Sequence, residues 1–148
     1  MFYILLLILI IFGEWKLKNY IEATYDFKKQ CPILKNHILI RKYHNQGAFL
    51  NMMEKKQKLL HMISIIFTLV ISMFFLFTLF HKGNHILKTG LTLLLGGAFS
   101  NTYDRLSRNY VIDYFSFCSP LKKFNRIVFN LSDFCIIIGA FITVLSSS

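Results

Sequence analysis

Acidic residues and cysteines are scarce in this sequence of 148 residues. Seven Asp and Glu stand against seventeen Lys and Arg, which gives a formal net charge of +10. The cysteines, Cys31, Cys118 and Cys135, show no Cys-x-x-Cys spacing, so neither a zinc site nor a disulfide framework organises the chain. A single bridge between Cys31 and Cys118 stays open. Apart from His81 and His85 in a turn, the histidines have no companion ligands, and we expect no metal and no cofactor.

Long charge-free runs set this chain apart from an ordinary soluble domain. It is 55% hydrophobic and 16% aromatic, with a mean hydropathy of +0.51. So short a chain cannot hide that many apolar side chains, because small domains leave a large share of their surface exposed. The basic residues flank the apolar runs. We therefore predict an integral membrane protein whose positive charge faces the headgroups of membrane lipids, with no nucleic-acid partner.

Four segments are apolar enough to suggest crossings of a bilayer. The clearest is 59–80, where twenty-two residues without Lys, Arg, Asp or Glu would span about 33 Å as a helix. The first has no basic segment before it and no small-x-small site after it, so we expect a permanent span and not a cleaved signal peptide. We predict one all-α membrane domain, 1–148, with four transmembrane helices at about 2–20, 59–80, 86–105 and 129–145, and with extramembrane segments 21–58 and 106–128.

Two stretches outside these helices have the pattern of short strands. His37 to Tyr43 is rich in Ile and Leu, and Tyr110 to Phe117 alternates apolar with polar positions. We expect them to pair into a small extramembrane β-sheet against the membrane surface. The third predicted span also contains small residues that let neighbouring helices approach closely: Gly90, Gly96, Gly97, Ala98 and Ser100.

Two aspartates adjoin predicted spans, where an ionisable side chain is costly. Asp113 follows the third span and Asp133 opens the fourth, so a tight connection would bring both carboxylates to one depth. Two carboxylates within hydrogen-bonding reach share one proton. One acts as general base toward a water, and the other polarises the peptide carbonyl. The pattern therefore indicates hydrolysis without a covalent intermediate.

Simpler interpretations stay open for each of these polar residues. The segment from Asn130 to Asp133 also fits an N-cap followed by an acid that starts a helix. Asp113 fits a solvated charge on a strand, and Asp104 with Arg105 fits an exposed pair at a helix end. Asn101 inside the third span is harder to explain in this way, because a buried amide in lipid must find partners.

Five short motifs follow one another in a fixed order along the chain. The first places an acid four residues before a lysine, here Glu14 and Lys18. Asn45-Gln46-Gly47-Ala48 matches N-x-G-A, and Asn101-Thr102-Tyr103-Asp104-Arg105 matches all but the first position of G-N-x-x-D-R. Residues 109–114 fit G-x-V-x-D-F and residues 129–133 fit F-N-x-A-D. Together they resemble the lipoprotein signal peptidases, membrane aspartyl proteases also called signal peptidase II.

The resemblance implies an activity, a substrate and a location. Asp113 and Asp133 would be the catalytic pair, and Asn45, Asn101, Arg105 and Asn130 would orient the acids or the substrate; Glu14, Lys18, Gly47 and Asp104 are further motif positions. The substrate would be a bacterial prolipoprotein, cut before a cysteine that carries a diacylglyceryl group. The enzyme would be a multi-pass monomer in the cell membrane with its active site toward the outer face, although the lysine-rich polar side would by charge alone face the cytoplasm.

Departures from the motifs indicate a divergent member. Glu14 stands where Asp is usual, Ser100 and Asn109 replace Gly, and Phe49 occupies a place usually taken by a small residue. Asn109 is the mildest, since Asn tolerates left-handed backbone. Two other functions fit a chain of this kind: a small proton-coupled multidrug transporter that uses Glu14, and an inactive paralogue that binds lipoprotein precursors.

Overall fold

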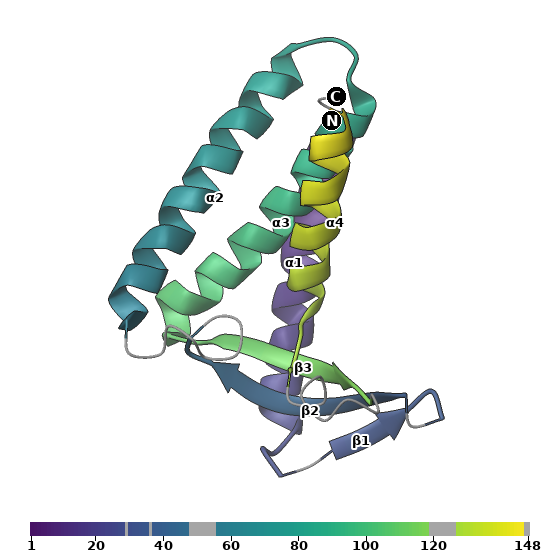
Figure 1. Ribbon diagram of the computed structural model, residues 1–148, viewed down its shortest axis with the longest axis vertical. Coiled ribbons are helices and arrows are strands. Elements are labelled where there is room, and N and C mark those ends of the chain that lie inside the picture. Colours follow the sequence, from purple (N-terminus) through teal and green to yellow (C-terminus); the bar gives the residue numbers. More distant parts are fainter. Residues whose placement is uncertain (29, 36, 48–55, 119–126, 147–148) are drawn as a thin grey trace.

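The computed structural model describes residues 1–28, 30–35, 37–47, 56–118 and 127–146. Within them, four helices extend away from a small sheet, with the C-terminal end of α1 running on behind it, and both termini lie at the end of the helices far from that sheet (Figure 1). The elements in chain order are α1 (Phe2–Thr24), β1 (Gln30–Ile33), β2 (Ile38–Asn45), α2 (Gln57–Phe80), α3 (His85–Arg108), β3 (Val111–Phe117) and α4 (Leu131–Ser146).

Each predicted span corresponds to a helix, but the boundaries differ. α1 continues to Thr24, four residues beyond its predicted end at 20, and α3 continues three residues past 105 to Arg108. α3 ends at Asn109, which has the left-handed φ of 66° that Asn tolerates. In the described part of the chain, α2 alone is both long and apolar enough to cross a membrane by length and composition, and α4 is a shorter apolar helix.

The predicted pairing of two strands is confirmed, and a third strand joins them. The sheet has the order β1-β2-β3 with antiparallel neighbours. β1, which the sequence did not predict, contains Pro32, and an edge strand tolerates a residue that cannot donate a ladder hydrogen bond. The register pairs Tyr43 with Asp113 and Asn45 with Val111. Because side chains alternate along a strand, Asn45 and Asp113 project from the same face of the sheet.

Close packing between α3 and α4 depends on glycine. A Cβ atom added at Gly97 would lie 2.4 Å from the Ser132 carbonyl oxygen, and one at Gly139 would lie 2.4 Å from the Leu94 nitrogen. Backbone occupies both places, so a larger residue would push the helices apart. The small residues of α3 therefore do what the sequence predicted, and they place the start of α4 directly beside α3.

The outer surfaces of the helices are apolar, and several charged side chains are buried inside. Leu9 on α1, Phe77 on α2 and Phe141 on α4 are each more than 60% exposed, whereas Lys18 and Asp113 are 1% exposed. A surface of this kind is stable only against an apolar partner or solvent. The fold thus places its polar groups between the helices at the end near the sheet.

Candidate active site

A cavity of about 330 Å³ lies where α2, α3, α4 and the sheet meet. Asp113 from β3 and Asp133 from the first turn of α4 both line it, so the structure brings the two predicted acids to one site. Its other polar lining residues include Asn45, Asn101 and Arg105. Much of the remaining wall is apolar, so few other polar side chains compete with the carboxylates for a bound ligand.

Asp113 is held by two side-chain amides. Asn45 Nδ2 donates to its Oδ2 at 2.9 Å, and Asn130 Nδ2 donates to its Oδ1 at 2.6 Å. Burial, and next the negative charge of Asp133, raise the pKa of Asp113 from its ordinary value of 3.8 to about 7. The amides oppose this change without cancelling it. Near neutral pH the two acids therefore readily keep one proton between them.

Asp133 caps a helix and also lines the cavity. Its backbone N–H donates to Asn130 Oδ1 at 3.0 Å, and the Asn130 N–H donates back to Asp133 Oδ2 at 3.1 Å, which is a reciprocal capping pair. The other carboxylate oxygen, Oδ1, accepts from Asn101 Nδ2 at 3.0 Å. The capping interpretation is thus correct, but it does not compete with a role in the cavity, since different oxygens make the two kinds of contact.

Asn130 joins the two acids. Its side-chain nitrogen binds Asp113, and its backbone nitrogen and side-chain oxygen both bind Asp133. The residue is fully buried. Since every polar group of this side chain is used, Asn130 fixes the position of one carboxylate relative to the other.

Arg105 lines the same cavity from the end of α3. Its Nη1 donates to the carbonyl oxygen of Asn101 at a long 3.4 Å, and its Nε is buried without a hydrogen-bond partner among the described residues. Neither aspartate forms an ion pair with it or with another basic residue in the described part of the chain. The guanidinium therefore keeps donors available for a ligand.

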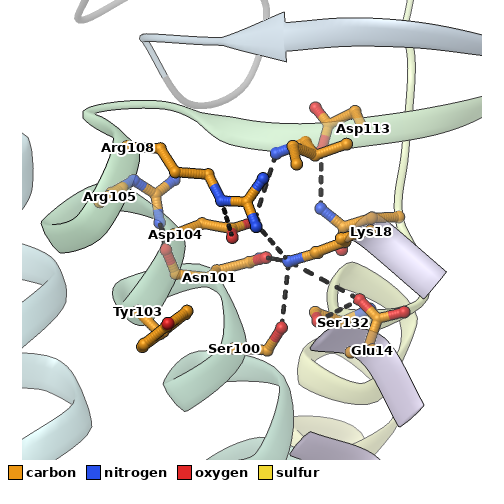
Figure 2. A network of polar contacts seen from close by, with 12 residues as sticks. Glu14, Lys18, Ser100, Asn101, Tyr103, Asp104, Arg105, Arg108, Asp113 and Ser132 are labelled. Atoms are coloured by element: carbon orange, nitrogen blue, oxygen red, sulfur yellow. Dashed lines mark hydrogen bonds and ion pairs between the residues drawn. The ribbon is translucent and has the colours of Figure 1, made fainter. Parts of the chain in front are cut away.

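A second buried cluster, which we call the Lys18 network, consists of Glu14, Lys18, Ser100, Asn101 and Asp104 (Figure 2). The Lys18 ammonium donates to Ser100 Oγ at 3.0 Å and to Asn101 Oδ1 at 2.9 Å. It also forms ion pairs with Asp104 at 3.0 Å and with Glu14 at 3.7 Å. One cation thus satisfies two carboxylates and reaches the amide that binds Asp133.

Asp104 is not the exposed partner of Arg105 that the simpler interpretation suggested. It is 2% exposed and pairs with Lys18 and with Arg108, whose Nε lies 3.4 Å from Oδ1. Its Oδ2 also accepts from the Ile112 backbone N–H at 3.3 Å. Asp104 therefore fastens α3 to the start of β3, one residue before Asp113.

Glu14 has hydroxyl partners that the sequence reasoning missed. Tyr114 donates its hydroxyl to Oε1 at 2.6 Å, and the hydroxyl of Ser132 donates to Oε2 at 2.6 Å. Burial, then the Glu14 charge, raise the pKa of Tyr114 above its ordinary value, so that the phenol keeps its proton. The sequence did contain a signal for these two partners, since a hydroxyl residue stands next to each aspartate at positions where the motifs have Phe and Ala.

The remaining predicted features take simpler forms. The Gly47 N–H donates to Asn45 Oδ1 at 3.2 Å and so helps to orient that amide. Cys31 and Cys118 are free, which answers the question of a bridge between them. Among the described residues, no group of three or more His, Cys, Asp or Glu could hold a metal ion. Phe49 lies outside the described residues.

Solved structures define the class of fold. The structure is similar to two that are each described as a bacterial membrane enzyme. One gives a TM-score of 0.83 at 22% sequence identity and covers 98% of this chain and 86% of that one. The other gives 0.80 at 21% identity and covers 98% and 91%. This likeness extends over the helices and the sheet together.

Sequence comparison identifies the family. The family model for signal peptidase (SPase) II matches residues 5–148, and the chain belongs to that family. A lipoprotein signal peptidase of Latilactobacillus sakei is 32% identical over 146 residues, covering 97% of this chain and 93% of that protein. One from Lactobacillus johnsonii is 31% identical over 137 residues, covering 93% and 85%. The expected family is therefore confirmed, and its members are peptidases.

Proposed function

We propose that this chain is an aspartic endopeptidase that removes the signal peptide from diacylglyceryl-modified bacterial prolipoproteins, cutting before the lipidated cysteine. The observation that carries the proposal is the pair of buried carboxyl groups, Asp113 and Asp133, which share one cavity and one binding residue, Asn130. Membership of the signal peptidase II family supplies the class of reaction.

The pair activates water without forming a covalent intermediate. One carboxyl group holds the shared proton and donates a hydrogen bond to the scissile carbonyl oxygen, while the ionised one takes a proton from the attacking water. The proton then passes to the leaving nitrogen as the carbon–nitrogen bond breaks. Because the two groups titrate together, the roles belong to the pair. Asn45, Asn101 and Asn130 orient the acids, and Arg105 contributes its free donors to the substrate backbone.

The apolar helices support a location in the membrane. We propose that α1 to α4 all cross the bilayer, as one monomeric domain of 148 residues surrounded by lipid. The sheet then lies at the outer face of the bacterial cell membrane, and the cavity opens at the depth where a lipid-anchored substrate presents its peptide bond. Exposed side chains such as Leu9, Phe77 and Phe141 support contact with acyl chains.

The transporter hypothesis is not favoured by the surroundings of Glu14. A proton-coupled carrier needs an acid that is accessible from a central cavity, whereas Glu14 is 1% exposed and bound to Lys18, Tyr114 and Ser132. An inactive paralogue would keep the fold, and only an assay separates it from an active enzyme.

The test is cleavage of a fluorogenic peptide that contains a lipobox with a diacylglyceryl cysteine, compared with the same peptide without the lipid. We expect the purified chain to cut only the lipidated peptide. Asp113→Asn and Asp133→Asn should each lower kcat by about 10³-fold or more, because both groups of the pair are needed. Asp26→Asn, which changes an exposed aspartate, is the matched control and should leave kcat unchanged.

Two results would contradict the proposal. Cleavage by Asp133→Asn at the wild-type rate would reduce that residue to a helix cap. A folded wild-type chain that binds the lipidated peptide and never cuts it would instead establish the inactive paralogue.

A further inference from the structure

Three polar side chains form a hydrogen-bonded group, and none of them is among the residues that line the cavity. Glu14 comes from α1, Tyr114 from β3 and Ser132 from the first turn of α4. The Glu14 carboxylate accepts from the hydroxyl groups of both other residues, at 2.6 Å each. Tyr114 is 5% exposed, and Glu14 and Ser132 are even more deeply buried. A carboxylate so far from water depends on these donors and on Lys18.

This group satisfies the start of α4. The first backbone N–H groups of a helix have no partner within it. In α4 the Leu131 N–H donates to the Tyr114 hydroxyl oxygen at 2.8 Å, and the Ser132 N–H donates to Glu14 Oε2 at 3.1 Å. The Asp133 N–H is taken by Asn130. The negative carboxylate at this helix end is also favoured by the helix dipole.

Each hydroxyl residue is the chain neighbour of one aspartate. Tyr114 follows Asp113, and its side chain projects from the opposite face of β3, where it packs with Ile112 and Ile21. Ser132 precedes Asp133. A shift of either hydroxyl residue would therefore move the backbone that carries one of the two acids.

In this group the length of the acid side chain matches the positions of the two hydroxyl donors. The five motifs have Asp, Phe and Ala at the places of Glu14, Tyr114 and Ser132. Phe and Ala donate no side-chain hydrogen bond, and Asp is one methylene shorter than Glu. In this chain all three places differ together, and the longer acid meets both added hydroxyls.

We propose that Tyr114 and Ser132 are positioning residues that act with Glu14 as one set, holding the start of α4 so that Asp133 faces Asp113. The proposal rests on the proposed peptidase function. It gives a role in the reaction to two residues that are not among those lining the cavity.

The test is a double-mutant cycle on the full chain in detergent or lipid. Glu14→Asp is made in the wild-type background and again with Tyr114→Phe plus Ser132→Ala. In the wild-type background Glu14→Asp should lower kcat for the diacylated peptide by about 10- to 100-fold, with KM within about threefold. In the background without the hydroxyls it should cost less than about threefold further, because the partners of the longer acid are already gone.

Two further measurements separate positioning from a general loss of stability. Tyr114→Phe alone should shift the alkaline limb of the pH profile of kcat, since the relative position of the two acids sets their shared titration. Tyr103→Phe and Ser72→Ala remove hydroxyls from a half-exposed position and from a bond within α2, and they should leave both kcat and the pH profile unchanged.

The outcomes are distinguishable. A wild-type chain that cuts no diacylated peptide contradicts the proposed function itself. An active wild type in which the changes multiply independently, or lower only the melting temperature while kcat and its pH profile stay fixed, overturns the positioning set and leaves the peptidase function in place.

Discussion

Two clusters of buried acids lie side by side in this protein, and they are stabilised by different chemistry. Asp113 and Asp133 bind neutral amides from Asn45, Asn101 and Asn130. In the Lys18 network, by contrast, the carboxylates pair with cations. An amide stabilises a carboxylate without fixing a full opposite charge beside it, so a proton can still come and go. In the Lys18 network a full positive charge lies directly beside the carboxylates of Glu14 and Asp104.

The difference teaches why one cluster can react and the other can only support it. A general base must change its protonation state during the reaction, whereas a structural ion pair must not. The first cluster also lines the cavity where α2, α3, α4 and the sheet meet, whereas Lys18 and Asp104 line a separate pocket. Burial alone, which both clusters share, would not have distinguished them.

Asn101 connects the two clusters, because its side chain binds both Lys18 and Asp133. Its Oδ1 accepts from the Lys18 ammonium, so only its nitrogen is left to face Asp133. An ammonium group has no acceptor, and the orientation of the amide is therefore dictated by Lys18. Lys18 therefore ensures that Asn101 presents its side-chain N–H group to Asp133.

The largest expected effect comes from removing the cation of the Lys18 network. Lys18→Met keeps the length of the side chain but leaves Glu14 and Asp104 buried without their shared partner. We expect the free energy of unfolding to fall by about 3–5 kcal/mol. Thermal or chaotrope unfolding in one detergent measures it, with Lys16→Met, an exposed lysine on the same helix, as the control.

A second change sharpens this result. Adding Glu14→Gln to Lys18→Met removes the carboxylate whose only ion-pair partner among the described residues is Lys18, so the double variant should be more stable than Lys18→Met alone. Equal mild losses of about 0.5 kcal/mol for the variants at 18 and 16 would mean that the network is not maintained by its cation.

The sequence predicted the helices and two of the strands because periodicity and apolar length are local properties. Leu59 to Phe80 has the composition of a helix that crosses a membrane, and β2 and β3 have the patterns of short strands. β1 was missed, since Pro32 indicated only that no helix passes there. Its four residues become a strand because β2 offers a free edge, which is a tertiary property.

The sequence predicted which residues belong to the site but not how those residues are arranged. Motif resemblance named both aspartates, but it did not show that Glu14, Lys18 and Asp104 would form a separate cluster behind them. Spacing along the chain cannot reveal that α1 directs Lys18 toward α3 and Glu14 toward the start of α4. Tyr114 and Ser132 were missed because hydroxyl residues are common and acquire a role only from the buried carboxylate they meet.

The second prediction concerns the proton that Asp113 and Asp133 share; we call these two acids, which bind amides of Asn45, Asn101 and Asn130, the amide-held pair. Since the pKa of Asp113 is raised to about 7, the pair loses this proton as the pH rises above that value. We expect kcat/KM for the diacylated peptide to fall about tenfold for each pH unit on the alkaline side. Activity that stays constant from pH 7 to 9 would contradict the requirement for a proton. The rate of the Asp26→Asn control should follow the wild-type profile.

The smallest expected effect for a single measured step is the change in stability over one pH unit, and it isolates Asp113 from catalysis. In the unfolded chain this group titrates near its ordinary value of 3.8, and in the folded chain near 7. Between these values the folded state binds more protons, so the free energy of unfolding must decrease as the pH rises, by at most about 1.4 kcal/mol per pH unit. Asp113→Asn has no proton to lose there, and its unfolding free energy should depend less steeply on pH than that of the wild type. Asp26→Asn, which changes an exposed side chain, is the control, and its slope should equal the wild-type slope. If Asp113→Asn and the wild type instead gave parallel curves from pH 4 to 7, Asp113 would titrate as an ordinary surface acid, and the contrast between the amide-held pair and the Lys18 network would be lost.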